Sequence, residues 1–148
     1  YNLRPVEMSG AIGLEQLKKL PGFVSQRRAN GAHFQACFKD HPCVQIQQEI
    51  GESSWFGFSL VIKENATFNR RQLVAALQAE GIECRPIVSG NFLTNESLKF
   101  FDYEVAGHVK NAEYIDKNGL FVGNHQIDLT AEITHTLVVI NQLCAEAT

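Results

Sequence analysis

The sequence predicts an α+β fold in which a small, mostly antiparallel sheet has helices packed on one face. Segments with helical periodicity occur together with short segments in which apolar and small residues alternate. The expected order is helix, helix, strand, strand, helix, strand, helix, strand, helix. At 148 residues, with 45% hydrophobic and 20% charged residues, the chain is long enough for one domain with its own core.

The first helix is expected over residues 5–20, because proline suits the first turn and apolar residues then recur on one side. Gly10 and Gly13 weaken this helix by up to about 1 kcal/mol each relative to alanine. We therefore expect another backbone to approach the helix closely at these glycines. Pro21 and Gly22 are expected to end the helix.

A second helix is expected over residues 23–39, with Arg27 and Arg28 solvated on its outer side. Residues spaced by seven, three and four positions lie on one face of a helix. The residues expected on the inner face are Val24, Gly31, Phe34 and Phe38.

Two strands are expected next. Residues 43–48 alternate weakly and suit an edge strand. Residues 54–62 give the clearest strand pattern, because large apolar residues alternate with small ones. The small side predicts close packing by another element. The large residues expected on the other face are Phe56, Phe58, Leu60 and Ile62.

A third helix is expected over residues 69–80, capped by Thr67 and ended by Gly81 in a left-handed conformation. The following strand, residues 82–88, contains Pro86. Proline donates no backbone hydrogen bond, so this strand is expected at an edge or to contain a bulge.

The loop at residues 89–103 is long for a compact domain, which indicates a functional or disordered segment. A helix over residues 107–118, a short buried strand at 120–122 and a final helix capped by Thr130 complete the expected fold. The apolar stripe expected on the final helix is Ile133, Leu137, Ile140 and Cys144.

Composition excludes several function classes. A net charge of -3 and a pI near 5.9 argue against a general nucleic-acid binder. Without an apolar run of about 18 residues, no membrane span is expected. The cysteines lack the spacing of a metal site, so we expect free thiols in a reducing cytoplasm and no bound metal. They are Cys37, Cys43, Cys84 and Cys144.

The most informative polar stretch begins at Glu83 and Arg85, which lie two residues apart on the expected strand and so point to the same face. The following loop adds Ser89, Asn91 and Phe92. This set suits a polar ligand with hydroxyl groups and negative charge, such as a nucleotide sugar, and arginine can bind phosphate or carboxylate through two hydrogen bonds. An ion pair on the surface of an edge strand is the other interpretation, and both stay open.

Two further places carry candidate polar groups. Asn2 and Arg4 open the chain, and Asn124 and His125 follow Gly123 in a loop. From the residues alone, ordinary turn residues are the better interpretation of both places. From the residues alone, the chain also fits a stand-alone ligand-binding module.

The stretch YNLRPVEMSGAIGL at residues 1–14 resembles the segment that opens the C-terminal part of pyridoxal-phosphate-dependent sugar aminotransferases and dehydratases of the DegT/DnrJ/EryC1/StrS family. Residues 51–58, 81–92 and 111–125 carry a narrower resemblance to one subgroup of that family. The resemblance extends over essentially the whole chain. It implies the C-terminal small domain of the fold-type-I aminotransferase architecture.

The resemblance implies that residues 1–40 form a helical segment leading to a cofactor-binding domain and that residues 41–148 form the small domain. It implies that the catalytic histidine or lysine lies outside this chain, so none of these residues is expected to be catalytic. We therefore expect a piece of a longer protein that is inactive alone, exposes apolar surface and associates.

Within the family, the resemblance is greatest to members that remove the 3-hydroxyl of GDP-4-keto-6-deoxymannose. A sugar 4-aminotransferase of the perosamine-synthase kind is the alternative. The implied cofactor is pyridoxal or pyridoxamine phosphate, the implied co-substrate is glutamate, and the implied enzyme is a cytoplasmic homodimer.

The resemblance also assigns roles to residues of this chain. It places Asn2 on the phosphate of the partner subunit's cofactor. It places Glu83 and Arg85 on the sugar-binding side. Weaker correspondences on that side are Ser89, Asn91 and Phe92.

Overall fold

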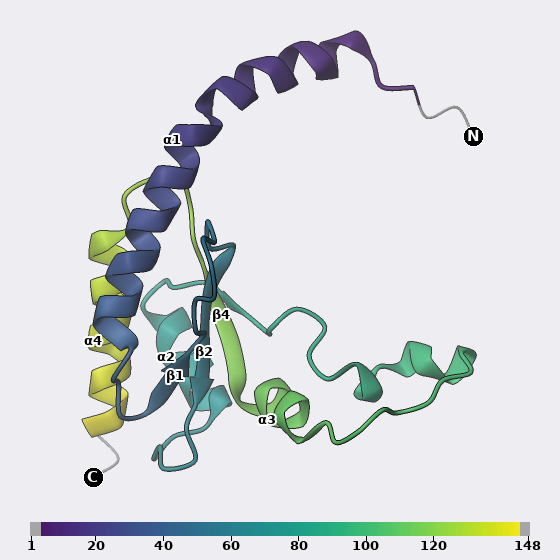
Figure 1. Ribbon diagram of the computed structural model, residues 1–148. Coiled ribbons are helices and arrows are strands. Elements are labelled where there is room, and N and C mark those ends of the chain that lie inside the picture. The colour runs from purple at the N-terminus through teal and green to yellow at the C-terminus, as the bar shows by residue number, and fades with distance from the viewer. Residues whose placement is uncertain (1–3, 146–148) are drawn as a thin grey trace.

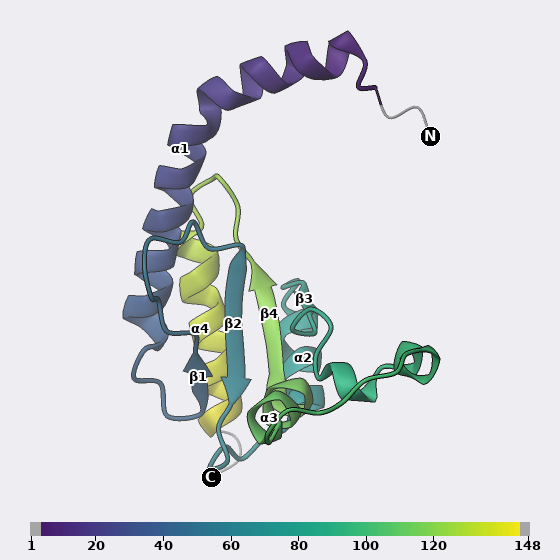
Figure 2. The same ribbon diagram turned by 45° about the vertical axis from the view of Figure 1, so that its right-hand side comes forward.

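The computed structural model describes residues 4–145 and contains a four-stranded antiparallel sheet with the strand order β1-β2-β4-β3. Helices α1, α2 and α4 lie on one face of the sheet, and α3 lies at one end of the opposite face (Figures 1 and 2). The predicted α+β class is therefore confirmed, with one helix on the second face. The elements are α1 Glu7–Phe38, β1 Val44–Ile46, β2 Gly57–Ile62, α2 Arg70–Ala79, β3 Cys84–Arg85, α3 Lys110–Asn118, β4 Gly119–Gly123 and α4 Thr130–Ala145.

The hydrophobic core lies between the sheet and α1, α2 and α4. In the register of β2 and β4, Leu60 pairs with Leu120, and both side chains are buried. Phe34 of α1 stacks on Phe58 of β2 with ring centroids 4.4 Å apart. Each large apolar side chain buried in this way stabilises the fold by about 1.5–3 kcal/mol. Other core residues are Phe38, Val44, Ile62, Leu73, Leu77, Ile133, Val139 and Ile140.

Helix α1 is one continuous helix, so the predicted break at Pro21 is wrong. A proline inside a helix removes one backbone hydrogen bond and bends the helix without necessarily ending it. The second half of α1 packs on the core, whereas the first half curves away from the sheet (Figure 1). Within residues 4–145, no atom lies within 4 Å of a Cβ built at Gly10 or Gly13, so this chain does not supply the expected close approach.

Strand β2 begins at Gly57, three residues later than predicted. The cause is Trp55, whose φ of 53° lies in the left-handed region and breaks the extended conformation. Phe56 was expected on the inner face with Phe58, and this prediction is wrong, because the residue is 80% exposed. A Cβ at Gly57 would lie 2.8 Å from the Val122 carbonyl oxygen, which is a close approach by the neighbouring strand β4 and not by an element packed on the small side.

Helix α2 is capped by Asn69 and not by Thr67, as predicted. The Asn69 side chain accepts the backbone N–H of Gln72, and the Gln72 side chain accepts the N–H of Asn69. These two hydrogen bonds satisfy the backbone N–H groups of Asn69 and Gln72. Thr67 lies too early in the chain to reach either group. Gly81 follows the helix with a φ of 75°, as expected.

Strand β3 is an edge strand of two residues, shorter than the seven predicted. Its pairing stops before Pro86, which has no N–H for the ladder, and Val88 has a φ of 42°. The long loop that follows contains two 3-10 turns, Phe92–Thr94 and Glu96–Phe100, and extends away from the sheet (Figure 2).

Cys43 and Cys144 form a disulfide, so the prediction that all four cysteines are free is wrong for this pair. The bond joins the start of β1 to the end of α4 across 101 residues. Sequence spacing could not reveal it, because the two ends become neighbours only when α4 packs on the sheet. Cys37 and Cys84 are free.

We predict opposite effects for two glycine-to-alanine substitutions in α1. A Cβ at Gly31 would lie 2.7 Å from the Trp55 indole, so Gly31→Ala should destabilise the fold by about 1–3 kcal/mol. A Cβ at Gly22 meets no atom within 4 Å, so Gly22→Ala should stabilise it by up to about 1 kcal/mol. Urea unfolding measures both, and equal effects would contradict this packing.

We also predict a pH-dependent contribution from His41. Its Nδ1 accepts the N–H groups of Cys43 and Val44, and its Nε2 lies 3.1 Å from Asn141 Oδ1. Burial, assisted by the charge of Lys63, lowers the pKa of His41 below its usual 6.5, although the Asn141 hydrogen bond opposes this.

Because the folded pKa is depressed, the unfolded chain binds more protons as pH falls below about 6.5, and the free energy of unfolding decreases. His41→Asn should reduce this loss between about pH 7.5 and about pH 5.5, whereas the exposed control His108→Gln should retain it. Equal losses in the two variants would show that His41 is not the responsible group.

Candidate functional site

A hollow of about 270 Å³ lies where α1, β3 and the end of β4 meet. It brings together the two residues that the sequence singled out most strongly, Glu83 and Arg85, with side chains that sequence reasoning did not assign to a site. The complete lining is Arg27, Phe56, Glu83, Arg85, Phe121, Gly123 and Asn124.

Glu83 and Arg85 form an ion pair on the rim of the hollow. Nε and Nη2 of Arg85 donate to the same oxygen of Glu83, at 3.0 and 2.7 Å. The side chains are 76% and 69% exposed, and exposed ion pairs contribute only about 0–1 kcal/mol to stability. The pair therefore adds little to the fold and remains accessible to a ligand.

Cys84 lies between these two residues, but it is not a nucleophile candidate. Burial, and secondly the negative charge of Glu83, raise the pKa of the Cys84 thiol above its usual value. The group therefore stays protonated at neutral pH, and the protonated thiol is a poor nucleophile.

Arg27 is half-buried, so the prediction that it is solvated is wrong. Its Nε donates to the Ser54 carbonyl at 2.9 Å, its Nη1 to the Asn124 carbonyl at 3.3 Å, and its Nη2 to the Trp55 carbonyl. A guanidinium has five donors in a fixed plane, which suits several carbonyl groups at once. Arg27 thus joins α1 to the turn before β2 and to the turn after β4. Its position four residues before Gly31 was the available signal, since both lie on one helical face.

Two buried asparagines extend this connection. The Nδ2 of Asn30 donates to Asn124 Oδ1 at 3.0 Å and to the carbonyls of His125 and Ile127 at 3.1 and 2.8 Å. The Nδ2 of Asn124 donates to the carbonyls of Arg27 and Trp55 at 3.1 and 3.0 Å. We call Arg27, Asn30 and Asn124 the polar clamp, because they hold two turns against α1.

The clamp stabilises a strained backbone at Trp55. A bulky residue with positive φ costs about 1–3 kcal/mol and persists only where surrounding contacts impose it. Here the Trp55 carbonyl accepts hydrogen bonds from both Arg27 and Asn124, and the indole packs against Gly31. This backbone conformation directs the next side chain, Phe56, toward Phe121, with ring centroids 6.0 Å apart.

The other predicted site residues do not line this hollow. Ser89 is exposed, and Phe92 is 52% exposed in the loop that follows β3. Asn91 is buried, and its side chain accepts the N–H of Leu93, which caps the first 3-10 turn. Asn2 lies outside the described residues. His125 is exposed, and its backbone carbonyl belongs to the network of Asn30.

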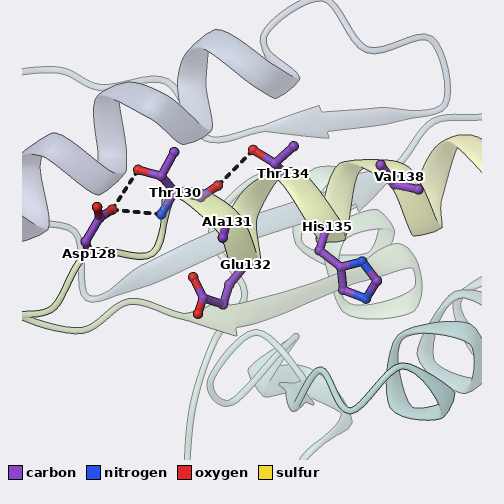
Figure 3. A pocket seen from close by; sticks show the side chains of 7 residues that line it. All are labelled: Asp128, Thr130, Ala131, Glu132, Thr134, His135 and Val138. Atoms are coloured by element: carbon purple, nitrogen blue, oxygen red, sulfur yellow. Dashed lines mark hydrogen bonds between the residues drawn. The ribbon is translucent and has the colours of Figure 1, made fainter.

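A second hollow lies along the outer surface of α4 (Figure 3). Its polar groups already have local partners. The Asp128 carboxylate accepts the N–H and hydroxyl of Thr130, and the Thr134 hydroxyl donates to the Thr130 carbonyl. These hydrogen bonds lower the pKa of Asp128 and serve the start of the helix. The lining is Asp128, Thr130, Ala131, Glu132, Thr134, His135 and Val138.

Neither a metal-binding cluster nor a membrane-spanning helix is found in the described part of the chain. Across residues 4–145, no group of three or more His, Cys, Asp or Glu side chains is placed to hold a metal ion. Over the same residues, no helix is long and apolar enough to cross a membrane.

The hollow does not by itself fit a pyridoxal phosphate group. None of its lining residues is a lysine, the residue to which this cofactor is commonly attached. Three nitrogens of Arg27 already donate to carbonyls, and Arg85 is paired with Glu83, so most guanidinium donors at the hollow are engaged within the chain. The hollow suits a polar ligand with an apolar face.

Comparison with known proteins agrees with this fold. The chain belongs to the DegT/DnrJ/EryC1/StrS aminotransferase family, whose model matches residues 1–138. It is 60% identical over 143 residues to the GDP-4-keto-6-deoxy-D-mannose 3-dehydratase of Yersinia pseudotuberculosis. It is 64% identical over 136 residues to the enzyme of that name from Escherichia coli O55:H7.

These alignments cover 96% and 91% of the chain but 36% and 35% of the two relatives. The chain thus spans about a third of the length of the curated relatives it matches.

Solved structures give the same picture. A structure of the E. coli GDP-4-keto-6-deoxy-D-mannose 3-dehydratase with bound hydrated PLP matches with a TM-score of 0.90 and 63% identity, over 94% of this chain and 36% of that one. A variant of such a dehydratase with bound GDP-perosamine matches with a TM-score of 0.91 and 62% identity, over 95% and 36%. The Helicobacter pylori aminotransferase PseC shares the fold with a TM-score of 0.81 and 18% identity, over 99% and 39%.

We predict that the polar clamp is essential for stability. In Asn30→Asp, a carboxylate oxygen replaces the Nδ2 donor and faces three acceptor oxygens, from Asn124, His125 and Ile127. The fold should lose about 2–4 kcal/mol by urea unfolding. The control Asn65→Asp, in an exposed turn, should change stability by less than about 0.5 kcal/mol. A similarly small loss in Asn30→Asp would contradict the clamp.

Proposed function

We propose that this chain is the C-terminal small domain of a pyridoxal-phosphate-dependent enzyme that removes the 3-hydroxyl of GDP-4-keto-6-deoxymannose. Identity of 60–64% to two 3-dehydratases over more than nine-tenths of the chain supports this most strongly. The aminotransferases among the solved structures are much less similar, as the 18% identity of PseC illustrates.

In this proposal the chain contributes to substrate binding. Arg85 and Glu83 present a donor and an acceptor on the rim of the hollow, which matches the two hydrogen-bonding capacities of sugar hydroxyl groups. Ser89, Asn91 and Phe92 are proposed on the same side of the substrate, farther along the loop. Asn2 is proposed to contact the phosphate of the partner subunit's cofactor.

The proposed cofactor supplies an electron sink when it is bound. The hollow does not fit that group, so we assign its chemistry and the catalytic base to no residue of this chain. Residues 1–40 are proposed as the segment that leads to the cofactor-binding domain, and residues 41–148 as the small domain. Glutamate is the proposed nitrogen donor, and the cytoplasm is the proposed location.

A homodimer is the proposed assembly. The first half of α1 curves away from the sheet (Figure 1). It exposes a series of large apolar side chains. Such a surface favours association. These side chains are Val6, Met8, Ile12, Leu14, Leu17 and Leu20.

The function is tested with the full-length protein, pyridoxal phosphate, glutamate and GDP-4-keto-6-deoxymannose. The expected products are a GDP-linked 4-keto-3,6-dideoxy sugar, identified by mass, and free ammonia. A 4-amino sugar that retains its 3-hydroxyl would overturn the dehydratase assignment in favour of a 4-aminotransferase. The 148-residue chain alone should give neither product, because no catalytic residue is assigned to it.

A further inference from the structure

We propose that Phe56 contacts the substrate, and that its ring forms an apolar wall of the hollow against which one face of the sugar ring lies. We further propose that Arg27 is a positioning residue that holds this wall in place. The inference rests on the proposed function, because it names the part of the nucleotide sugar that the hollow takes.

The exposure of Phe56 is the first observation. Its ring is 80% exposed, although the neighbouring Trp55 and Phe58 are buried in the core. An exposed phenylalanine adds little to stability, and a contiguous apolar surface beside polar groups indicates a binding site. Phe56 and Phe121 line the same hollow as the Glu83–Arg85 pair.

The strained backbone before Phe56 is the second observation. Trp55 has a positive φ, and the carbonyls of Ser54 and Trp55 both accept hydrogen bonds from Arg27. Without these bonds the segment would relax toward an extended strand, in which Phe56 would point to the opposite side. Arg27 therefore acts on the hollow through the backbone and not through its charge.

Charge decides which part of a nucleotide sugar fits. Arg85 is neutralised by Glu83, and three nitrogens of Arg27 are taken by carbonyl groups. A diphosphate would have to displace Glu83 from Arg85 before it could bind that guanidinium. A sugar ring instead offers hydroxyls to both Glu83 and Arg85 and a weakly polar face to the aromatic wall.

The experiment uses the full-length protein and steady-state kinetics with GDP-4-keto-6-deoxymannose. Phe56→Ala should raise KM roughly tenfold and change kcat less than about threefold, because contact with the wall is made in both the bound and the transition state. Phe56→Tyr should restore KM, since it keeps the ring. Val138→Ala, which removes an exposed apolar side chain on α4, should leave KM unchanged.

The inhibition constant of GDP shows whether Phe56 contacts the sugar or the nucleotide part of the substrate. GDP lacks the sugar, so its inhibition constant should not change in Phe56→Ala. A rise equal to that of KM would place the wall against the base or phosphates and overturn the sugar assignment. An unchanged KM in Phe56→Ala would overturn the proposal, whether or not the sedimentation coefficient of the variant changes. It would show that Phe56 packs against protein and not against the sugar.

A double-mutant cycle tests the positioning role. Arg27→Met should raise KM as Phe56→Ala does, and the double variant should be no worse than either single variant. Arg28→Met removes a neighbouring exposed guanidinium and should leave KM unchanged. Additive effects would show that Arg27 does not act through Phe56.

These outcomes are distinct from failure of the proposed function. If the wild-type protein transaminates the sugar, the dehydratase assignment fails, but the effect of Phe56→Ala on KM is still measured with the same nucleotide sugar.

Discussion

The hydrogen bonds between α1 and two turns of the sheet hold the site of this protein together. Arg27, Asn30 and Asn124 donate to backbone carbonyls on both turns, and the side chains of Asn30 and Asn124 hydrogen-bond each other. Buried polar groups of this kind are costly when unpaired, so the arrangement favours one relative position of helix and turns. That position determines the strained Trp55 and the exposed Phe56 that follows it.

Stability and site geometry therefore both depend on helix α1, but through different contacts. The aromatic stack of Phe34 and Phe58 holds α1 on the sheet through burial of apolar area. The clamp fixes the orientation of the Trp55 peptide group, because the hydrogen bonds to its carbonyl depend on angle. A substitution in the clamp can thus disturb the hollow while the core stays packed.

The architecture was predictable because periodicity and capping residues are local signals. The inner face of the second half of α1, the inner face of β2 from Phe58 onward and the end of α2 at Gly81 follow from spacing. The continuation of α1 through Pro21 was not predictable from the local break signal, because a proline can bend a helix without ending it. The Cys43–Cys144 bond depends on contacts across 101 residues, which spacing does not encode.

The same distinction applies to the site. Glu83 and Arg85 were visible as a same-face pair on a strand, whereas Arg27 and Phe56 join them through the left-handed backbone of Trp55. The most direct test is a crystal structure of the full-length protein with GDP-perosamine. We expect the sugar ring in the hollow, against Phe56 and beside Glu83 and Arg85. A sugar bound elsewhere, with Phe56 covered by another protein segment, would contradict it.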